Sequence, residues 1–183
     1  MSERHKVFVS YYHDEDQAYR NKFEKLCQDV MVSKSIQPGD IDTDTNTERV
    51  MQRIRDEYIR DSTVTVVLIG LHTWQRKYVD WEIYSSLRLT SSKLRSGLLG
   101  MLLPTRPDND TGKYDGCTVP PRLYDNTQKN NNLEPYAHIY NWTEDPDLIQ
   151  KRIDRAFSVR YSYTPDLHRD RFGTNHNTPN WCN

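Results

Sequence analysis

Short apolar runs recur along the chain and predict β-strands that are buried on both faces. The clearest run, TVTVVLIG at 63–70, is continuously apolar after Thr65, as expected of a central strand in a parallel sheet. A weaker pattern suggests one further strand in a turn-rich segment that contains Pro38. The predicted strands cover 7–9, 36–41, 63–70, 97–104 and 137–142.

Between the predicted strands, apolar residues recur at the spacing that is typical of one face of a helix. The last of these segments has a clear start signal, because Asp145 can cap the helix and Pro146 fits its first turn. Residues 105–135 look irregular. The predicted helices cover 15–32, 47–58, 75–89 and 145–157.

The alternation of strands and helices predicts an α/β domain built on one open parallel sheet. Five strands suggest the flavodoxin-like strand order 2-1-3-4-5, with helices on both faces of the sheet. We assign residues 1–160 to this domain and 161–183 to a C-terminal tail. The aromatic residues of the tail gain by burial, so we expect the tail to pack on the domain or on a partner protomer.

In sheets of this kind, ligands bind at the carboxyl ends of the strands where the strand order reverses, here between the first and third strands. This rule selects the two segments that follow those strands, 10–13 and 70–74, as candidates for binding a substrate. The candidate residues in them are Ser10, Tyr11, Tyr12, His13, Leu71, His72 and Trp74.

The helix predicted after the second segment carries an aromatic–aromatic–carboxylate pattern. Trp74, Tyr78 and Glu82 are spaced i, i+4, i+8, which places them close to one stripe of a helix. Two interpretations are open. Glu82 is the acid of an active site, or it pairs with a basic side chain while the two aromatic residues pack.

A lone carboxylate among aromatic rings suits cleavage of a nicotinamide–ribose bond. O-glycosidases need two carboxyl groups, because the leaving oxygen must be protonated. Nicotinamide instead departs as a neutral amide, so one carboxylate can hold the ribose hydroxyls and stabilise an oxocarbenium-like transition state. Aromatic rings can stack on the nicotinamide or adenine and limit access of water. The chain has no P-loop, GxSxG or HExxH motif that would indicate other chemistry.

The composition sets further bounds. The net charge of −1 at pH 7 gives no indication of a nucleic-acid or anionic-membrane partner. No apolar stretch approaches membrane length and the N-terminus lacks a signal-peptide pattern, so we expect a cytoplasmic location. The cysteines, Cys27, Cys117 and Cys182, lie far apart, which argues against a disulfide framework and a zinc site.

The acidic residues do not indicate a metal site. Segment 40–48 resembles the start of a calcium loop, but Thr47 and Arg53 stand where glycine and glutamate are required. Asp14 and Asp16 are expected to cap the first helix and to interact with its dipole. We therefore expect neither a metal nor a cofactor.

Three segments give the chain a family resemblance. They are KVFVSYYHDED at 6–16, DSTVTVVLIGLHTWQRKYVDWEI at 61–83, and VPPRLYDN at 119–126 ahead of YNW. Together they resemble the TIR-like domains of the ThsB type from bacterial Thoeris anti-phage systems. The resemblance covers about residues 5–160 and implies the same flavodoxin-like fold.

The resemblance implies an enzyme that cleaves NAD as its substrate and makes a cyclic or conjugated ADP-ribose signal. That signal would diffuse to a separate effector after an unknown phage trigger. The family's catalytic glutamate matches Glu82, and Ser10, Tyr11 and Tyr12 match the loop that lines the nucleotide site. The common pattern is W-x-x-x-E, in which Tyr78 replaces the tryptophan here. Self-association is also expected, because many TIR enzymes complete their site between protomers.

Two other classes of function stay open at this point. A catalytically silent TIR-like module that recruits a partner is favoured slightly by the tyrosine at position 78. A receiver-like domain of the same shape is disfavoured, because the third strand ends in Leu68-Ile69-Gly70 and not in an aspartate.

Overall fold

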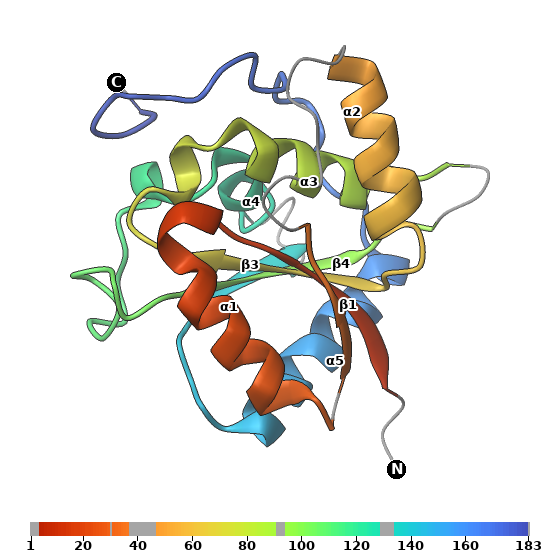
Figure 1. Ribbon diagram of the computed structural model, residues 1–183, viewed down its shortest axis with the longest axis vertical. Helices are drawn as coiled ribbons and strands as arrows, with labels where there is room; N and C mark the ends of the chain where they lie inside the picture. Colours follow the sequence, from red (N-terminus) through yellow and green to blue (C-terminus); the bar gives the residue numbers. More distant parts are fainter. Residues whose placement is uncertain (1–3, 30, 37–46, 91–93, 129–133, 183) are drawn as a thin grey trace.

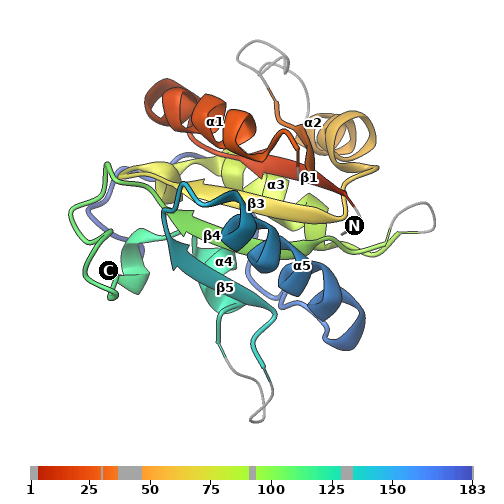
Figure 2. The ribbon, with the colours of Figure 1, turned by 90° about the horizontal axis from the view of Figure 1, so that it is seen from below.

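The computed structural model describes residues 4–29, 31–36, 47–90, 94–128 and 134–182. It contains one five-stranded sheet in the order β2-β1-β3-β4-β5, and each neighbouring pair of strands is parallel. Helices cover both faces of the sheet (Figures 1 and 2). The predicted flavodoxin-like fold and strand order are therefore confirmed.

The sheet is apolar in its centre and becomes more polar at its edges. All six residues of β3 and all six of β4 are buried, whereas the two edge strands are mostly partly exposed. This is the pattern of a parallel sheet that is covered on both sides. The strands are β1 (His5–Ser10), β2 (Met31–Lys34), β3 (Val64–Ile69), β4 (Gly97–Leu102) and β5 (Ala137–Asn141).

Two helical layers enclose the sheet. One layer packs through residues such as Phe23 of α1 and Ile153 of α5, and the other through Ile83 of α3, Leu123 of α4 and Ile54 of η1. The helical elements are α1 (His13–Cys27), α2 (Thr47–Arg53), η1 (Ile54–Ile59, a π-helix), the 3₁₀ turns η2 (Thr73–Gln75) and η3 (Gly116–Thr118), α3 (Lys77–Leu87), α4 (Pro121–Asp125) and α5 (Pro146–Ser162).

The second strand was placed wrongly from the sequence. The helix predicted to end at residue 32 ends at Cys27, and β2 begins at Met31. Ile36 lies outside any strand, and the remainder of the predicted strand, 37–41, lies outside the described residues, as does most of the calcium-like segment. β2 is a four-residue edge strand of sequence MVSK, so pairing with β1 and not its own pattern defines it.

The helix predicted over 75–89 is shorter and is broken near its start. Arg76 has an extended backbone between the η2 turn and α3, and the helix runs from Lys77 to Leu87. The segment predicted to be irregular contains η3 and the short helix α4, which begins at Pro121. The strand that follows is found at its predicted position, whereas the helix predicted over 145–157 extends to Ser162, beyond the predicted domain end at residue 160.

The tail after α5 returns to the helical layer that contains α3 and α4. It passes along the outer side of α3, away from the sheet (Figure 1). Trp181 donates a hydrogen bond from Nε1 to the carbonyl of Val119, and Cys182 forms a disulfide with Cys117. The prediction that the cysteines form no disulfide is wrong for this pair, because packing of the tail brings together two residues that lie 65 positions apart.

Candidate functional site

Glu82 and Ser10 meet at the carboxyl edge of the sheet. Ser10 is the last residue of β1, and Glu82 lies on α3, whose Val79, Ile83 and Leu87 pack on the sheet. The Ser10 hydroxyl donates a hydrogen bond to Oε2 of Glu82. Both residues are buried, with exposed fractions of 1% and 3%. The fold therefore places a carboxylate where this class of sheet binds ligands.

Burial changes the acidity of this carboxyl group. The loss of hydration raises the pKa of Glu82 to about 8, and the hydrogen bond from Ser10 acts in the opposite direction with a smaller effect. At neutral pH the Glu82 side chain is consequently mostly protonated in this structure. Catalytic acids and bases commonly have pKa values that are shifted strongly in this way.

Tyr78 lies one helical turn before Glu82 and is half-buried. Its ring packs edge-on against Trp81, with ring centroids 5.3 Å apart, and joins the apolar cluster around Phe8. Trp81 is itself buried and donates a hydrogen bond from Nε1 to the carbonyl of Phe172 in the tail, at 2.8 Å. The apolar cluster and the tail thus hold Tyr78 and Trp81 in place.

Trp74 does not lie on the same helix as Tyr78 and Glu82. It belongs to the η2 turn and is buried, and its nearest recorded ring partner is His176 of the tail at 6.3 Å. The expected continuous stripe is therefore wrong at its first position. The turn is fixed by Thr73, whose hydroxyl accepts a hydrogen bond from the Gly70 amide, so helical periodicity could not extend back to Trp74.

The loop after β1 divides into a buried and an accessible part. Tyr11 is buried and donates a hydrogen bond from its hydroxyl to Gln17 of α1 at 2.7 Å. The ring of His13 lies 4.5 Å from that of Tyr11. Tyr12 is half-buried and its hydroxyl donates to Asp14. Ser10 and Tyr12 both contact residues that follow β3, because Ser10 donates to Glu82 and the Arg76 guanidinium stacks on Tyr12.

Two contacts each link a residue of one selected segment to a residue just beyond the end of the other segment. The guanidinium of Arg76 stacks on the ring of Tyr12, with Cζ 3.9 Å from the ring centroid. His72 Nδ1 lies 2.9 Å from both carboxylate oxygens of Glu15. Leu71 is exposed. The structure therefore brings the two predicted segments side by side, and it adds Arg76, which sequence reasoning missed because the residue has no motif of its own.

A second buried carboxyl group lies in this region. Asp16 of α1 is fully buried, and its Oδ2 accepts a hydrogen bond from the Thr73 hydroxyl at 3.0 Å. Burial raises the pKa of Asp16 to about 6, against the effect of that hydrogen bond. The expected role as a helix cap is wrong for Asp16, because Tyr12 occupies the N-cap position without a side-chain cap.

The absence of a side chain at Gly70 makes room for Asp16. A Cβ at Gly70 would lie 2.3 Å from Oδ1 of Asp16, which has no hydrogen-bond partner among the described residues. Asp16 and Thr73 together hold the loop after β3 against α1. No local sequence signal distinguishes Asp16 from its exposed acidic neighbours.

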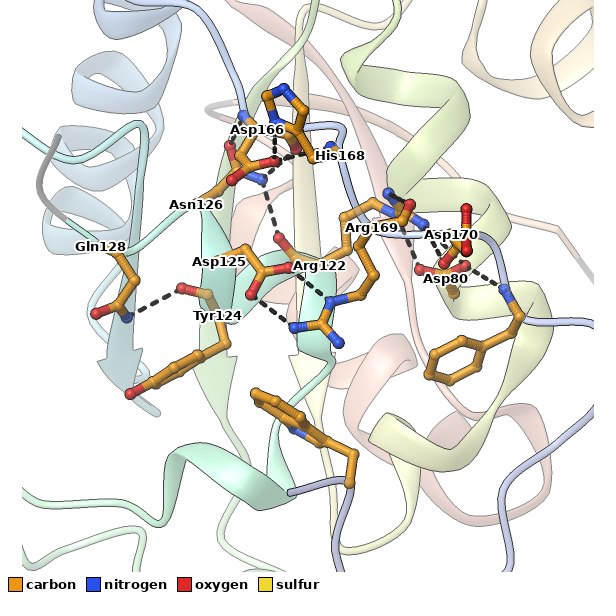
Figure 3. A network of polar contacts seen from close by, with 12 residues as sticks. Asp80, Arg122, Tyr124, Asp125, Asn126, Gln128, Asp166, His168, Arg169 and Asp170 are labelled. Carbon is orange, nitrogen blue, oxygen red and sulfur yellow. Dashed lines mark hydrogen bonds and ion pairs between the residues drawn. The ribbon is translucent and has the colours of Figure 1, made fainter. Parts of the chain in front are cut away.

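A buried ion pair fixes the tail to α3 and α4 (Figure 3). Arg122 donates from Nε to Asp80 at 2.8 Å, and the exposed fractions of the two side chains are 1% and 2%. Arg122 also donates to the carbonyls of Arg169 and Asp170, while Asp80 accepts the amide N–H of Phe172. Asp80 precedes Glu82 by two residues, so the tail supports the helix that carries the candidate acid.

The parallel sheet and the carboxylate at its strand-order reversal define a TIR-like domain. A scan against known protein families agrees, because residues 8–108 match the family described as Thoeris protein ThsB, TIR-like domain. This match covers more than half of the chain, and the protein belongs to that family. It includes both candidate segments and Glu82 but ends before α4 and the tail. A search of curated proteins finds no match.

Within the described part of the chain, no helix combines the length and apolar character needed to cross a membrane.

Proposed function

We propose that this member of the Thoeris family is an enzyme that cleaves the nicotinamide–ribose bond of NAD. The observation that carries the proposal is the pairing of Glu82 with Ser10 at the carboxyl edge of the sheet. A carboxyl group that is this deeply buried is costly to ionise, and stability alone gives no reason to keep it at a ligand-binding edge.

In the proposed mechanism the charge of the substrate activates the enzyme. The nicotinamide ring of NAD is cationic, and a nearby cation favours the ionised form of a carboxyl group. Binding of NAD would therefore lower the raised pKa of Glu82 and release its proton. The resulting carboxylate can hold the ribose hydroxyls and stabilise positive charge on the ribose as neutral nicotinamide departs.

The Ser10 hydroxyl has a positioning role in this mechanism. It holds the Glu82 carboxylate in one orientation and favours its ionised form. Tyr78 and Tyr12 are the half-buried aromatic side chains from which a stacking surface for the nicotinamide or adenine ring can be built. Neither a metal ion nor a bound cofactor is required for these steps.

The family membership supports the wider role that we propose. The protein would act in the bacterial cytoplasm during phage infection and would convert the ADP-ribosyl group into a cyclic or conjugated product. That product would reach a separate effector by diffusion. Activity would depend on a phage trigger and on self-association that completes the site.

A catalytically silent interaction module is the second candidate. Two observations favour it: Glu82 is only 3% exposed, and Tyr78 stands at the usual tryptophan position. In that case the Ser10–Glu82 pair would be a structural contact at the base of a protein-binding surface.

Product analysis separates the two candidates. The purified protein is incubated with NAD, with and without lysate from phage-infected cells, and the products are followed by mass spectrometry. Release of nicotinamide supports the enzyme, and the mass of the second product distinguishes hydrolysis from cyclisation or conjugation. An unchanged NAD pool in both conditions, with folded protein, supports the interaction module.

A further inference from the structure

Arg76 is a cation that lies against Tyr12 at the start of α3, and it forms no ion pair with an acidic side chain of the described residues. Its guanidinium stacks on Tyr12 at 3.9 Å, and its Nε is buried without a hydrogen-bond partner among the described residues. The polar contact recorded for the side chain is a long one, 3.5 Å from Nη2 to the Gln75 amide oxygen. A buried guanidinium N–H group without a partner is uncommon in proteins.

The acidic side chains around Tyr12, on whose ring Arg76 stacks, interact with other groups. Asp14 accepts the hydroxyl of Tyr12 at 2.9 Å, and Glu15 lies 2.9 Å from His72. Arg76 is absent from the ion pairs found among the described residues, whereas Arg20, Arg106 and Arg169 each have a carboxylate partner. Among the described residues, the Arg76 guanidinium therefore has no carboxylate partner that would compete with an anionic ligand.

Stacking on Tyr12 preorganises the Arg76 side chain for binding an anion. It fixes the plane of the guanidinium, so that less conformational freedom is lost when a ligand binds. The fork of N–H donors on an arginine matches the oxygens of a phosphate better than any other side chain does. Arg76 also directly precedes α3, whose first turn favours negative charge.

The short chain distance between Ser10, which contacts Glu82, and Tyr12, which contacts Arg76, indicates the kind of anion. Tyr12 follows Ser10 by two residues, a span of at most about 7 Å along the chain. In a dinucleotide, the diphosphate is separated from the nicotinamide–ribose bond by one ribose. A ribose held at Ser10 and Glu82 would thus place its diphosphate close to Tyr12.

We propose that Arg76, held by Tyr12, binds the diphosphate of the dinucleotide. This inference rests on the proposed function, because it places the ribose at Glu82. Arg76 is then a binding residue that selects diphosphate-containing ligands, and Glu82 performs the chemistry.

A binding experiment tests this without relying on turnover. The full-length chain, Arg76→Ala and Arg76→Lys are titrated with ADP-ribose and with adenosine by calorimetry. Arg88→Ala is the matched control, because Arg88 flanks the other end of α3 and lies 5.5 Å from the ring of Tyr84. Loss of a charge-assisted hydrogen bond predicts at least tenfold weaker binding of ADP-ribose by Arg76→Ala and a partial loss in Arg76→Lys.

Three results would overturn the inference. They are no binding of ADP-ribose by the unmodified chain, equal binding by Arg76→Ala, and an equal loss of adenosine binding. The proposed function is tested separately, by comparing nicotinamide release in the same preparations. If NAD is cleaved, Arg76→Ala should raise KM about tenfold or more and leave kcat within about twofold. If NAD is not cleaved while Arg76 still determines ADP-ribose binding, the proposed function fails and the diphosphate site stands.

Discussion

The hydroxyl of Ser10 donates a hydrogen bond to the carboxyl group of Glu82, although the two residues lie 72 positions apart. The contact links the end of β1 to α3 across the place where the strand order of the sheet reverses. It is also the interaction that opposes the effect of burial on the pKa of Glu82. This contact therefore orients the candidate acid and partly offsets the effect of burial on its pKa.

Replacement of Ser10 by alanine should shift the pH dependence of NAD cleavage. Without the hydroxyl, the pKa of Glu82 rises further, because burial is then opposed by one hydrogen bond fewer. The acidic limb of the pH–rate profile should move to higher pH, and activity should recover toward the wild-type value in alkaline buffer. Ser62→Ala is the control, since Ser62 is also buried but donates its hydrogen bond to Ile59. The same shift in both variants would contradict this role for Ser10.

The raised pKa of Glu82 also predicts how stability depends on pH. In the unfolded chain Glu82 ionises near its ordinary pKa of 4.5, whereas in the folded protein it keeps its proton up to about pH 8. The folded state therefore binds the additional proton, and the free energy of unfolding falls as pH rises through this window. Asp16 contributes in the same direction only up to about pH 6, so the range from pH 6 to 8 isolates Glu82.

Denaturant unfolding at pH 6 and pH 8 measures this effect. Glu82→Gln should lose less stability than the wild-type protein over this range, by on the order of 1 kcal/mol per pH unit. Asp16→Asn provides the comparison, because its pH dependence above pH 6 should match that of the wild type. Parallel pH curves for Glu82→Gln and wild type would show that Glu82 is ionised in the folded protein.

The tail should depend on the buried pair formed by Asp80 and Arg122. Arg122→Met leaves Asp80 buried without its cation, which typically costs about 3–5 kcal/mol. The same change removes the donors to the carbonyls of Arg169 and Asp170, so trypsin should cleave the tail sooner. The double variant Asp80→Leu/Arg122→Met should recover part of the lost stability. Failure of Arg122→Met to change either unfolding or proteolysis would rule out this anchoring role.

The disulfide between Cys117 and Cys182 should stabilise the oxidised protein. It closes a loop with a sequence separation of 65 residues, for which the chain-entropy relation gives about 4 kcal/mol. Reduction with dithiothreitol should lower the unfolding free energy of the wild type to that of Cys182→Ser. The reductant should leave Cys182→Ser itself unchanged. A wild type that does not respond to reduction would show that the bond is not formed in solution.

The disulfide also bears on the proposed location. Cytoplasmic thiols are normally kept reduced, so in that compartment the bond would be open for most molecules. The other tail contacts do not depend on it, since Trp81, Asp80 and Arg122 hold the segment around Phe172 by hydrogen bonds. In the reduced protein, α3 should therefore keep its contacts with the tail. Activity measurements with and without dithiothreitol can check this.

The fold could be predicted from the sequence where burial on both sides produced a continuous apolar run, as in β3 and β4. β2 was placed wrongly because an edge strand such as Met31–Lys34 is defined by its pairing with β1. The break at Arg76 was missed because Thr73 fixes the preceding turn through side-chain contacts with Gly70 and Asp16.

The candidate site, like the fold, could be predicted only in part from the sequence. Ser10 could be selected because the topology of a parallel sheet determines which strand ends meet. Glu82 was selected from its spacing to Trp74 and Tyr78 and from the family resemblance. The Asp80–Arg122 pair and the disulfide could not be selected, because residues in the tail complete them. Arg76 could not be selected either, because its contact with the ring of Tyr12 exists only in the folded structure.

In the proposed function, Glu82 is the catalytic carboxyl group of an NAD-cleaving enzyme. The most direct test is the initial rate of nicotinamide release from NAD by equal amounts of folded wild type, Glu82→Gln and Glu57→Gln, each with and without lysate from infected cells. Glu57 lies on η1 and pairs with Arg53, so its variant controls for the loss of a carboxylate elsewhere. We expect Glu57→Gln to match the wild type and Glu82→Gln to be slower by at least about 100-fold. Release of nicotinamide by Glu82→Gln at a rate close to that of the wild type, or no release by the folded wild type, would contradict the account.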